Sequence, residues 1–376
     1  MRPDDLPRRV RDTMTELVRI PAPPGEEQLI GAYVSERLAA LDIDASWDAA
    51  GNLIAAVPES RREESCGPLL LGAHLDRVAP ASGCEPLVQA DQMLSDGVAT
   101  LGADDAAGIT IILLTLEELH RRQIPHGPLT LLFSSRNELG LKGVREFDPA
   151  PWGAREGIVF ENAGMPGTIV TRGPEIITID ATFRGIAGHT GQELAGTASA
   201  VEMFRRLELP TGVLDGGLTR ISLERVTGGT ARNAIAAELV VEGEVRTMLG
   251  ADAQDQWRRR IVAAFDAAAT AVGGTAHVEF VHSPAYRVGL DEPLVVAYRE
   301  AWESAGGRAQ TLSTFVGGDA NVLRAMKGLD VFTVSIGVIG EHTPAETIAL
   351  DPLERLTLTT VKLLGAYRPA PTGTPA

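Results

Sequence analysis

Residues of the types that bind divalent metal ions recur at the ends of apolar segments in this chain of 376 residues. His74 follows the apolar run at 69–73, and Asp76 comes two residues later, so both side chains of an extended segment point the same way and Asp76 could orient the imidazole. Four more candidates stand in glycine-rich or strand-end contexts: Asp104, Glu138, Glu161 and His342. Two histidines and three carboxylates, one of them bridging, would suit a pair of divalent ions at a hydrolytic site.

Each of these residues, taken singly, has a simpler explanation. A histidine in a loop is more often a capping or surface residue than a ligand, and the acidic pair before the helix at 106–124 is more often a helix N-cap. The elements around them therefore decide the interpretation.

Apolar strands alternate with helical segments in the first half of the chain. Strands are expected at 52–58, 68–76 and 127–135, with a helix at 26–43 and, within 103–124, a loop that enters a long helix. This alternation predicts an α/β fold with a mixed, largely parallel sheet flanked by helices, and the carboxyl ends of such strands are where open α/β sheets place their chemistry.

The pattern changes near residue 175 and returns near residue 285. Between these points, alternating strands and a long helix at 252–273 predict an inserted α+β domain. The expected organisation is a discontinuous catalytic domain of residues 1–174 and 284–376, with a second domain of residues 175–283.

Charge and composition exclude several classes of function. The formal net charge of −16 argues against a nucleic-acid partner, because such a surface needs a basic excess. The two cysteines, Cys66 and Cys84, fit neither a disulfide framework nor a metal-ligand spacing. No apolar run is long enough to cross a membrane, and the charged N-terminal segment predicts a cytoplasmic protein rather than a secreted one.

The sequence around the candidate ligands resembles that of the M20 family of co-catalytic metallopeptidases, in its peptidase T-like branch. The matching segments are GAHLDRV at 72–78, LGADDAAG at 101–108, FENAGMPGTIVTRGP at 160–174 and GEHTPAE at 340–346. The resemblance implies two divalent metal ions, above all Zn²⁺ with Mn²⁺ or Co²⁺ as alternatives, held by His74, Asp104, Glu138, Glu161 and His342. It also implies that Asp104 bridges the ions and that its peptide bond to Asp105 is cis.

For the inserted domain, the resemblance implies a lid that also forms a homodimer. His189 would then reach the active site of a partner subunit and stabilise an oxyanion, while Asn233 and Arg246 would bind the carboxylate of a small-molecule or peptide substrate. The simpler alternatives are a loop histidine, a turn asparagine and a surface arginine.

Asn137 departs from the family pattern at the catalytic position. Family members carry two adjacent glutamates at the end of this strand, a general base followed by a ligand, but here Asn137 precedes Glu138, and Arg136 replaces the acid before the pair. Because an amide accepts no proton at neutral pH, hydrolysis by the usual route should be impaired. Glu341 and Asp105 are possible replacements for the base.

Two arginines are further departures. Arg77 stands where members of the family have a small threonine. Together with Arg136 it could bind an anionic substrate. Alternatively, Arg77 points outward and Arg136 pairs with a surface acid.

Three functions remain open from the sequence. The first is a dimeric M20-type hydrolase of small peptides or N-acyl amino acids with an altered base. The second is a metal-dependent enzyme that uses the same site for lyase, cyclisation or acyl-transfer chemistry. The third is a non-catalytic relative that binds a ligand or partner.

Overall fold

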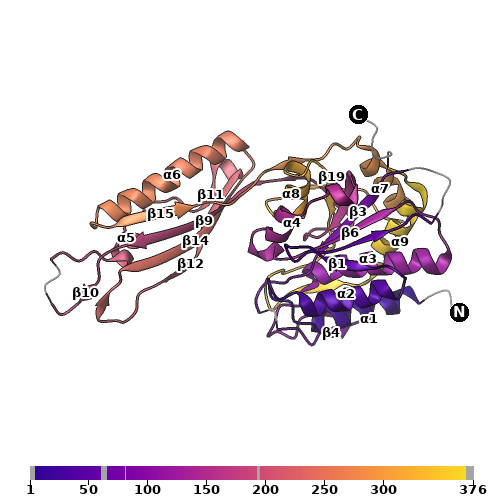
Figure 1. Cartoon of the computed structure of the whole chain (residues 1–376), viewed down its shortest axis with the longest axis horizontal. Helices are drawn as coiled ribbons and strands as arrows, with labels where there is room; N and C mark the ends of the chain where they lie inside the picture. Colours follow the sequence, from indigo (N-terminus) through magenta and orange to yellow (C-terminus); the bar gives the residue numbers. More distant parts are fainter. Residues whose placement is uncertain (1–4, 61–65, 81, 193–194, 370–376) are drawn as a thin grey trace. The chain divides into compact units, whose positions relative to one another are not determined.

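The computed structural model describes residues 5–60, 66–80, 82–192 and 195–369. The chain divides into two compact units, one made of residues 1–172 and 286–376 and the other of residues 173–285 (Figure 1). The boundaries expected from the sequence, after residues 174 and 283, differ from these by two residues at each crossing.

The first unit is built on a mixed sheet. Its strands run in the order β1-β2-β6-β3-β7-β19-β8-β17, with β18 beside β8. The bounds are β1 Ala45–Trp47, β2 Leu53–Val57, β3 Leu69–His74, β6 Leu129–Ser134, β7 Glu156–Phe160, β8 Ile169–Gly173, β17 Tyr286–Arg287, β18 Thr311–Ser313 and β19 Asp330–Val334. Strands β6, β3, β7 and β19 pair in parallel with one another, while β2 and β8 run antiparallel at their two sides, which confirms the predicted α/β fold with a mixed, largely parallel sheet.

The central strands are buried on both faces. All six residues of β3 and all six of β6 are buried, which is why their sequences are nearly continuous apolar runs rather than alternating ones. A separate small sheet, in the order β20-β5-β4, consists of β4 Leu87–Gln89, β5 Gln92–Leu94 and β20 Thr347–Ala349.

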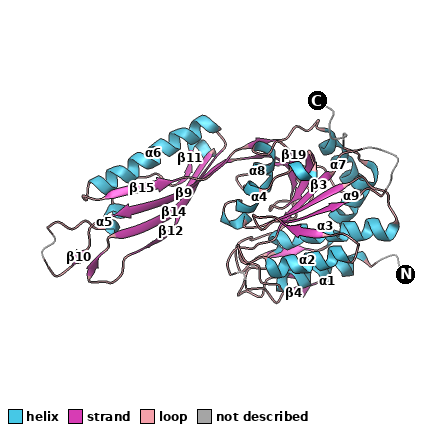
Figure 2. Cartoon of the chain, viewed as in Figure 1, coloured by secondary structure: helices cyan, strands magenta, loops and turns pink. Residues whose placement is uncertain are grey.

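Helices cover the large mixed sheet of the first unit (Figure 2). They are α1 Leu6–Arg19, α2 Gln28–Ala39, α3 Ala103–Arg122, α4 Lys142–Glu146, α7 Pro293–Ser304, α8 Asp319–Ala325 and α9 Asp351–Ala366. Helix α3 packs on β3 and β7, with α1 and α9 against it, while α8 packs on β19 and β17 with α4 against it. The packing of α3 places its N-terminal end beside the carboxyl ends of the parallel strands.

The second unit is an antiparallel sheet with a long helix and its own hydrophobic core. Its elements are β9 Glu175–Arg184, β10 Gly188–His189, α5 Ala200–Arg205, β11 Gly212–Leu214, β12 Thr219–Gly228, β13 Ala234–Ile235, β14 Glu238–Thr247, α6 Ala251–Thr270, β15 Thr275–Glu279 and β16 His282–Ser283. Trp257, Ile261 and Phe265 are buried at helical spacing on α6, and the Phe265 ring stacks on Phe183 of β9 with centroids 5.0 Å apart. The lid and dimerisation roles of this unit stay predictions.

In the described part of the chain, no helix combines the length and the apolar character that crossing a bilayer requires.

Candidate metal centre

The carboxyl ends of three parallel strands bring the candidate ligands of the first unit to one edge of the sheet. His74 is the last residue of β3, and Glu161 follows β7 directly. Glu138 lies in a short 3₁₀ turn, Asn137–Leu139, that follows β6, and Asp104 lies in the first turn of α3. The peptide bond between Asp104 and Asp105 is cis, as the family resemblance implied.

Three of the predicted ligands form one group. His74, Asp104 and Glu138 each offer a ligand atom, and these atoms all lie within 4.8 Å of one another. Nε2 of His74 is 3.3 Å from Oδ1 of Asp104. A histidine and two carboxylates at this spacing are the donor set that divalent transition-metal ions take in proteins.

His342 joins the group from a distant segment. Its Nε2 lies 3.0 Å from Oε1 of Glu138 and 3.8 Å from Oδ2 of Asp104. The two oxygens of Asp104 therefore face two different histidines, His74 at one and His342 at the other. This is the arrangement expected of a carboxylate that bridges two ions.

Two features of the first unit fit a bound cation. Oε1 of Glu138 is buried, and apart from Nε2 of His342 at 3.0 Å it has no polar partner among the residues that the structure describes. Nδ1 of His74 is 2.9 Å from the carbonyl oxygen of Asp76, which can only accept, so Nδ1 carries a proton and Nε2 is left facing Oδ1 of Asp104. A ring nitrogen and a carboxylate oxygen at such a distance need a proton or a cation between them, so the residues present suit a metal ion.

The charges of the group are tightly coupled. Burial alone would lower the pKa of His74, but hydrogen bonds to Asp104 and Asp76 outweigh it and raise the pKa well above its usual value. The carboxylates of Asp104 and Glu138 raise the pKa of His342 to about 10. Burial opposes ionisation of Asp104, yet the neighbouring His342 and His74 hold the pKa of that carboxyl well below its usual value.

Asp76 acts on the loop rather than on the imidazole. Its carboxylate is fully buried and accepts the backbone N–H groups of Asn137 at 2.9 Å and Glu138 at 3.0 Å. The hydrogen bond from His74 goes to the backbone carbonyl of Asp76, while the nearer carboxylate oxygen is 3.6 Å from Nδ1. The expected orienting contact is therefore made by the main chain, and the carboxylate holds the turn that carries Glu138.

Glu161 lies at the same sheet edge in a crowded site. It is 5% exposed and accepts a hydrogen bond of 3.3 Å from the Thr333 hydroxyl. Burial raises the pKa of its carboxyl, and the negative charge of Asp319 adds to the shift. A Cβ at Gly318 would lie 1.9 Å from Oε1 of Glu161, so the loop before α8 reaches the carboxylate only because residue 318 is a glycine.

The two possible replacements for the general base, Asp105 and Glu341, differ in their surroundings. Asp105 is 2% exposed, and its two oxygens accept the N–H groups of His74 and Gly108, each at 2.9 Å. Glu341 is half-buried, and its Oε2 makes no hydrogen bond to any residue in the described ranges. Burial, and then the charge of Asp104, raise the pKa of Glu341 to about 7.

The sequence analysis missed one carboxylate of the site, Asp319. It is 1% exposed at the start of α8, where it accepts hydrogen bonds from the Ser134 hydroxyl and from Nδ2 of Asn137, the latter at 2.8 Å. The sequence signal is GGD before a short helix, a common helix start that gives no sign of partners far away in the chain.

The two arginines have partners other than the candidate ligands. Arg77 is 2% exposed, and its guanidinium donates to the carbonyls of Val18 at 2.8 Å and Leu17 at 3.1 Å, at the C-terminal end of α1. The alternative in which Arg77 points outward is therefore wrong, and its binding of an anionic substrate stays a prediction. Arg136 donates to the carbonyl of Ala50 at 2.6 Å and lies 3.9 Å from the exposed Glu146, as the surface-acid alternative holds.

The second unit brings two of its predicted residues together. Residues 188–189 pair with 234–235, and Nε2 of His189 lies 3.4 Å from Nδ2 of Asn233 on an exposed surface. Arg246 stands elsewhere, on β14, and its guanidinium binds both carboxylate oxygens of Glu244 at 2.7 and 3.0 Å. Their roles toward a substrate stay predictions.

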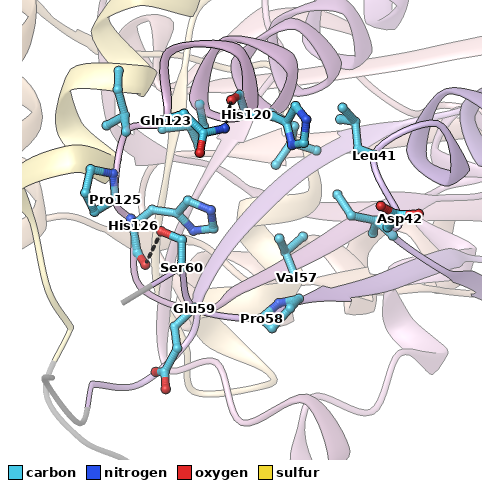
Figure 3. A pocket seen from close by; sticks show the side chains of 14 residues that line it. Leu41, Asp42, Val57, Pro58, Glu59, Ser60, His120, Gln123, Pro125 and His126 are labelled. Carbon is cyan, nitrogen blue, oxygen red and sulfur yellow. Dashed lines mark hydrogen bonds between the residues drawn. The ribbon is translucent and has the colours of Figure 1, made fainter. Parts of the chain in front are cut away.

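A hollow of about 450 Å³ lies at the other end of α3 (Figure 3). Its lining includes Val57, Leu119, His120 and His126, but none of the candidate metal ligands. The candidate chemistry of the first unit is therefore at the sheet edge and not in this hollow.

No family model matches the chain, but known proteins are similar to it in sequence. The protein YqjE of Bacillus subtilis, which is uncharacterised, is 26% identical over 357 residues that cover 92% of this chain and 95% of YqjE. Peptidase T of Escherichia coli is 30% identical over 187 residues, 49% of this chain and 43% of peptidase T.

Solved structures extend the likeness to almost the whole chain. A tripeptidase from Staphylococcus aureus superposes with a TM-score of 0.82 at 25% identity, over 96% of this chain and 98% of that one. The YXEP protein of Bacillus subtilis, a dinuclear metal-binding peptidase of the M20 family, has the same fold with a TM-score of 0.65 at 17% identity, over 96% and 98% of the two chains. The chain therefore shares the fold of M20 peptidases and is similar in part of its sequence to peptidase T. The discontinuous sheet domain and the grouped His74, Asp104 and Glu138 accompany this likeness.

Proposed function

We propose that this protein is a dinuclear-metal-dependent hydrolase of the M20 type that cleaves a small peptide or an N-acyl amino acid with a free carboxylate. The observation that carries the proposal is the convergence of His74, Asp104 and Glu138 within 4.8 Å, with His342 beside them. The S. aureus tripeptidase, by its name an enzyme of small peptides, supports the substrate class, and E. coli peptidase T supports peptidase activity.

The residues present would divide the work as follows. His74, Asp104, Glu138, Glu161 and His342 would hold two ions, with Asp104 shared between them as the family resemblance implies. Zn²⁺, Mn²⁺ or Co²⁺ bound there would polarise the scissile carbonyl and activate water for attack. Asp76 keeps Glu138 in place by holding the backbone of its turn.

The group that would accept the proton from water differs from the family pattern. Asn137 cannot take a proton from water, and Asp105 is engaged by backbone N–H groups at both oxygens. Glu341 retains a buried oxygen that bonds to no described residue. Replacing Glu341 with Gln, at constant metal content, tests whether this carboxylate serves in place of a glutamate at position 137.

A second candidate function is favoured by one observation, the amide at position 137. Without an ionisable side chain there, the same site could act as a Lewis acid in lyase, cyclisation or acyl-transfer chemistry on a carboxylate-bearing substrate. No observation favours a non-catalytic role, because an unused site has no physical need for the grouped ligands.

The homodimer through the second unit and the cytoplasmic location are part of the proposal. The dimer is tested by light scattering of the purified chain, where a single species of twice the mass of 39.8 kDa is expected. A monomer at micromolar concentration would exclude His189 from acting in a partner subunit.

The experiment that tests the proposed function compares substrates with and without a free carboxylate. Metal-stripped protein is reconstituted with Zn²⁺, Mn²⁺ or Co²⁺ and incubated with di- and tripeptides, N-acyl amino acids and the methyl esters of each. Metal-dependent release of the free amine from an acid, but not from its ester, is expected. Fully metal-loaded protein that releases no amine from any of them would contradict the proposal.

A further inference from the structure

Asp319 is a buried carboxylate that contacts the end of β6 and the turn that follows this strand. The hydroxyl of Ser134, the last residue of β6, donates to Oδ2 of Asp319, and Nδ2 of Asn137 donates to Oδ1 at 2.8 Å. Ser134 is fully buried, and Asp319 is 1% exposed. Each oxygen of this carboxylate thus has a donor, and one of the donors is the residue at the catalytic position.

The contact fixes which way the Asn137 amide faces. A carboxylate only accepts, so the branch of the amide that meets Asp319 is its NH₂ group, and the oxygen branch points elsewhere. The backbone of Asn137 is also held, because its N–H donates to Asp76 at 2.9 Å. Among the residues that the structure describes, none donates to the amide oxygen of Asn137, which leaves that oxygen as a fixed, neutral acceptor beside Glu138.

Charge explains why an amide suits this position in this chain. A glutamate or aspartate at 137 would meet the Asp319 carboxylate at hydrogen-bond distance, and two like charges there repel. Burial raises the pKa of Asp319, and the hydrogen bonds from Ser134 and Asn137 oppose that shift. The amide and the buried acid are therefore complementary partners, and each constrains what the other can be.

We propose that Asp319 is a positioning residue that orients the Asn137 amide, so that this pair sets an amide beside Glu138 and an acid behind it. The fixed amide oxygen then accepts a hydrogen bond from an N–H or O–H group of the substrate or from the attacking water. The catalytic part of this inference rests on the proposed hydrolase function, whereas the pairing itself does not.

The pairing is tested on the metal-free protein with an exchange cycle. Asp319→Asn places two amides face to face, and Asn137→Asp places two carboxylates face to face. Each single change is expected to lower Tm, and the double exchange, which restores one acid and one amide, is expected to recover most of the loss. Additive losses in the double variant would overturn the pairing.

A second measurement covers the case in which a single variant does not fold. In the wild-type protein labelled with ¹⁵N, the side-chain NH₂ group of Asn137 should exchange with solvent far more slowly than that of Asn233, which lies on an exposed surface of the second unit. Ser134→Ala leaves the Asn137 contact in place and should keep this protection. Fast exchange at Asn137 in the wild type would contradict the fixed orientation.

The positioning role is tested on the metal-loaded protein. Asp319→Ala, which removes the acceptor, should lower kcat about tenfold or more with unchanged metal content and little change in KM, because a freed amide loses its orientation. The double exchange should exceed both single variants in kcat, since it brings a carboxylate to position 137 with an amide donor behind it. A KM effect alone, or a double variant no better than the singles, would overturn the role. If no form hydrolyses anything while the Tm cycle still shows recovery, the proposed function fails and the pairing stands.

Discussion

Nε2 of His342 lies 3.0 Å from Oε1 of Glu138, although the two residues come from the two separate chain segments of the first unit. That oxygen of Glu138 is buried, and no other described residue donates to it. A buried carboxylate needs a neighbouring positive charge, which either a protonated His342 or a cation held jointly with His74 and Asp104 would supply. This relationship is the structural basis for a metal centre.

Removing a ligand of this group should empty the site. We expect His74→Ala and Glu138→Ala each to lower the metal content per chain, as measured by elemental analysis after dialysis against a trace of Zn²⁺. His126→Ala is the matched control, since His126 lies in the hollow at the other end of α3 and should not change the content. Unchanged stoichiometry in both ligand variants would count against the centre.

Arg246 should bind the substrate carboxylate once its guanidinium separates from Glu244. Arg246→Ala is expected to raise KM for carboxylate-bearing substrates about tenfold, the order of effect of losing a charge-assisted hydrogen bond. Glu244→Gln removes the partner that now binds both ends of the guanidinium and should lower KM. Kinetics on an acid and its methyl ester decide the matter, because equal effects on both would exclude a carboxylate contact.

Arg77 should matter for stability and not for substrate binding. Arg77→Leu leaves the carbonyls of Leu17 and Val18 at the end of α1 without their donor, and we expect a loss of about 1–3 kcal/mol in the free energy of unfolding. Urea denaturation measures this loss, and KM should stay within about twofold of the wild type. A raised KM without a change in stability would favour the substrate-binding interpretation.

Glu118 should make the fold sensitive to acid. Its side chain is fully buried and is bound by Arg9 at 2.6 Å, by Arg121 at 2.7 Å and by Arg122. Burial alone would raise the pKa of Glu118, but the hydrogen bonds from Arg121, Arg9 and Arg122 outweigh it and hold the pKa at about 2, against an ordinary value of 4.5.

Because the pKa is depressed in the folded state, the ionised carboxylate stabilises the fold above pH 4.5, and this contribution fades as the pH falls toward 2. Glu118→Gln should therefore be less stable by on the order of 2 kcal/mol near neutral pH, with a difference that shrinks below the ordinary pKa. Unfolding curves from pH 7 to 3 measure this, with the exposed Glu59→Gln as control. A difference that is independent of pH would contradict the account.

The sheet of the first unit was predictable because its strands are buried on both faces. Continuous apolar runs at 69–74 and 129–134 leave little choice of structure, and parallel pairing then brings residues that follow them to one edge. The grouping of His74, Asp104 and Glu138 follows from the same rule, although their binding of metal stays a prediction.

Side-chain partners from distant segments were not predictable in the same way. Arg77 extends to the end of α1, and Asp319 meets Ser134 and Asn137 from a helix far along the chain. In each case the local sequence is compatible with several directions of the side chain. The tertiary packing chooses among them, and no spacing in the sequence records that choice.

The measurement that tests the central claim most directly compares three metal-reconstituted proteins, wild type, Asn137→Glu and His74→Ala, for release of free amine from di- and tripeptides and N-acyl amino acids. The account predicts that the wild type hydrolyses at least one carboxylate-bearing substrate, that His74→Ala does not, and that the wild-type activity disappears with a chelator. A wild type that is inert at full metal content, beside an Asn137→Glu variant that hydrolyses, would contradict it and assign the site to non-hydrolytic chemistry.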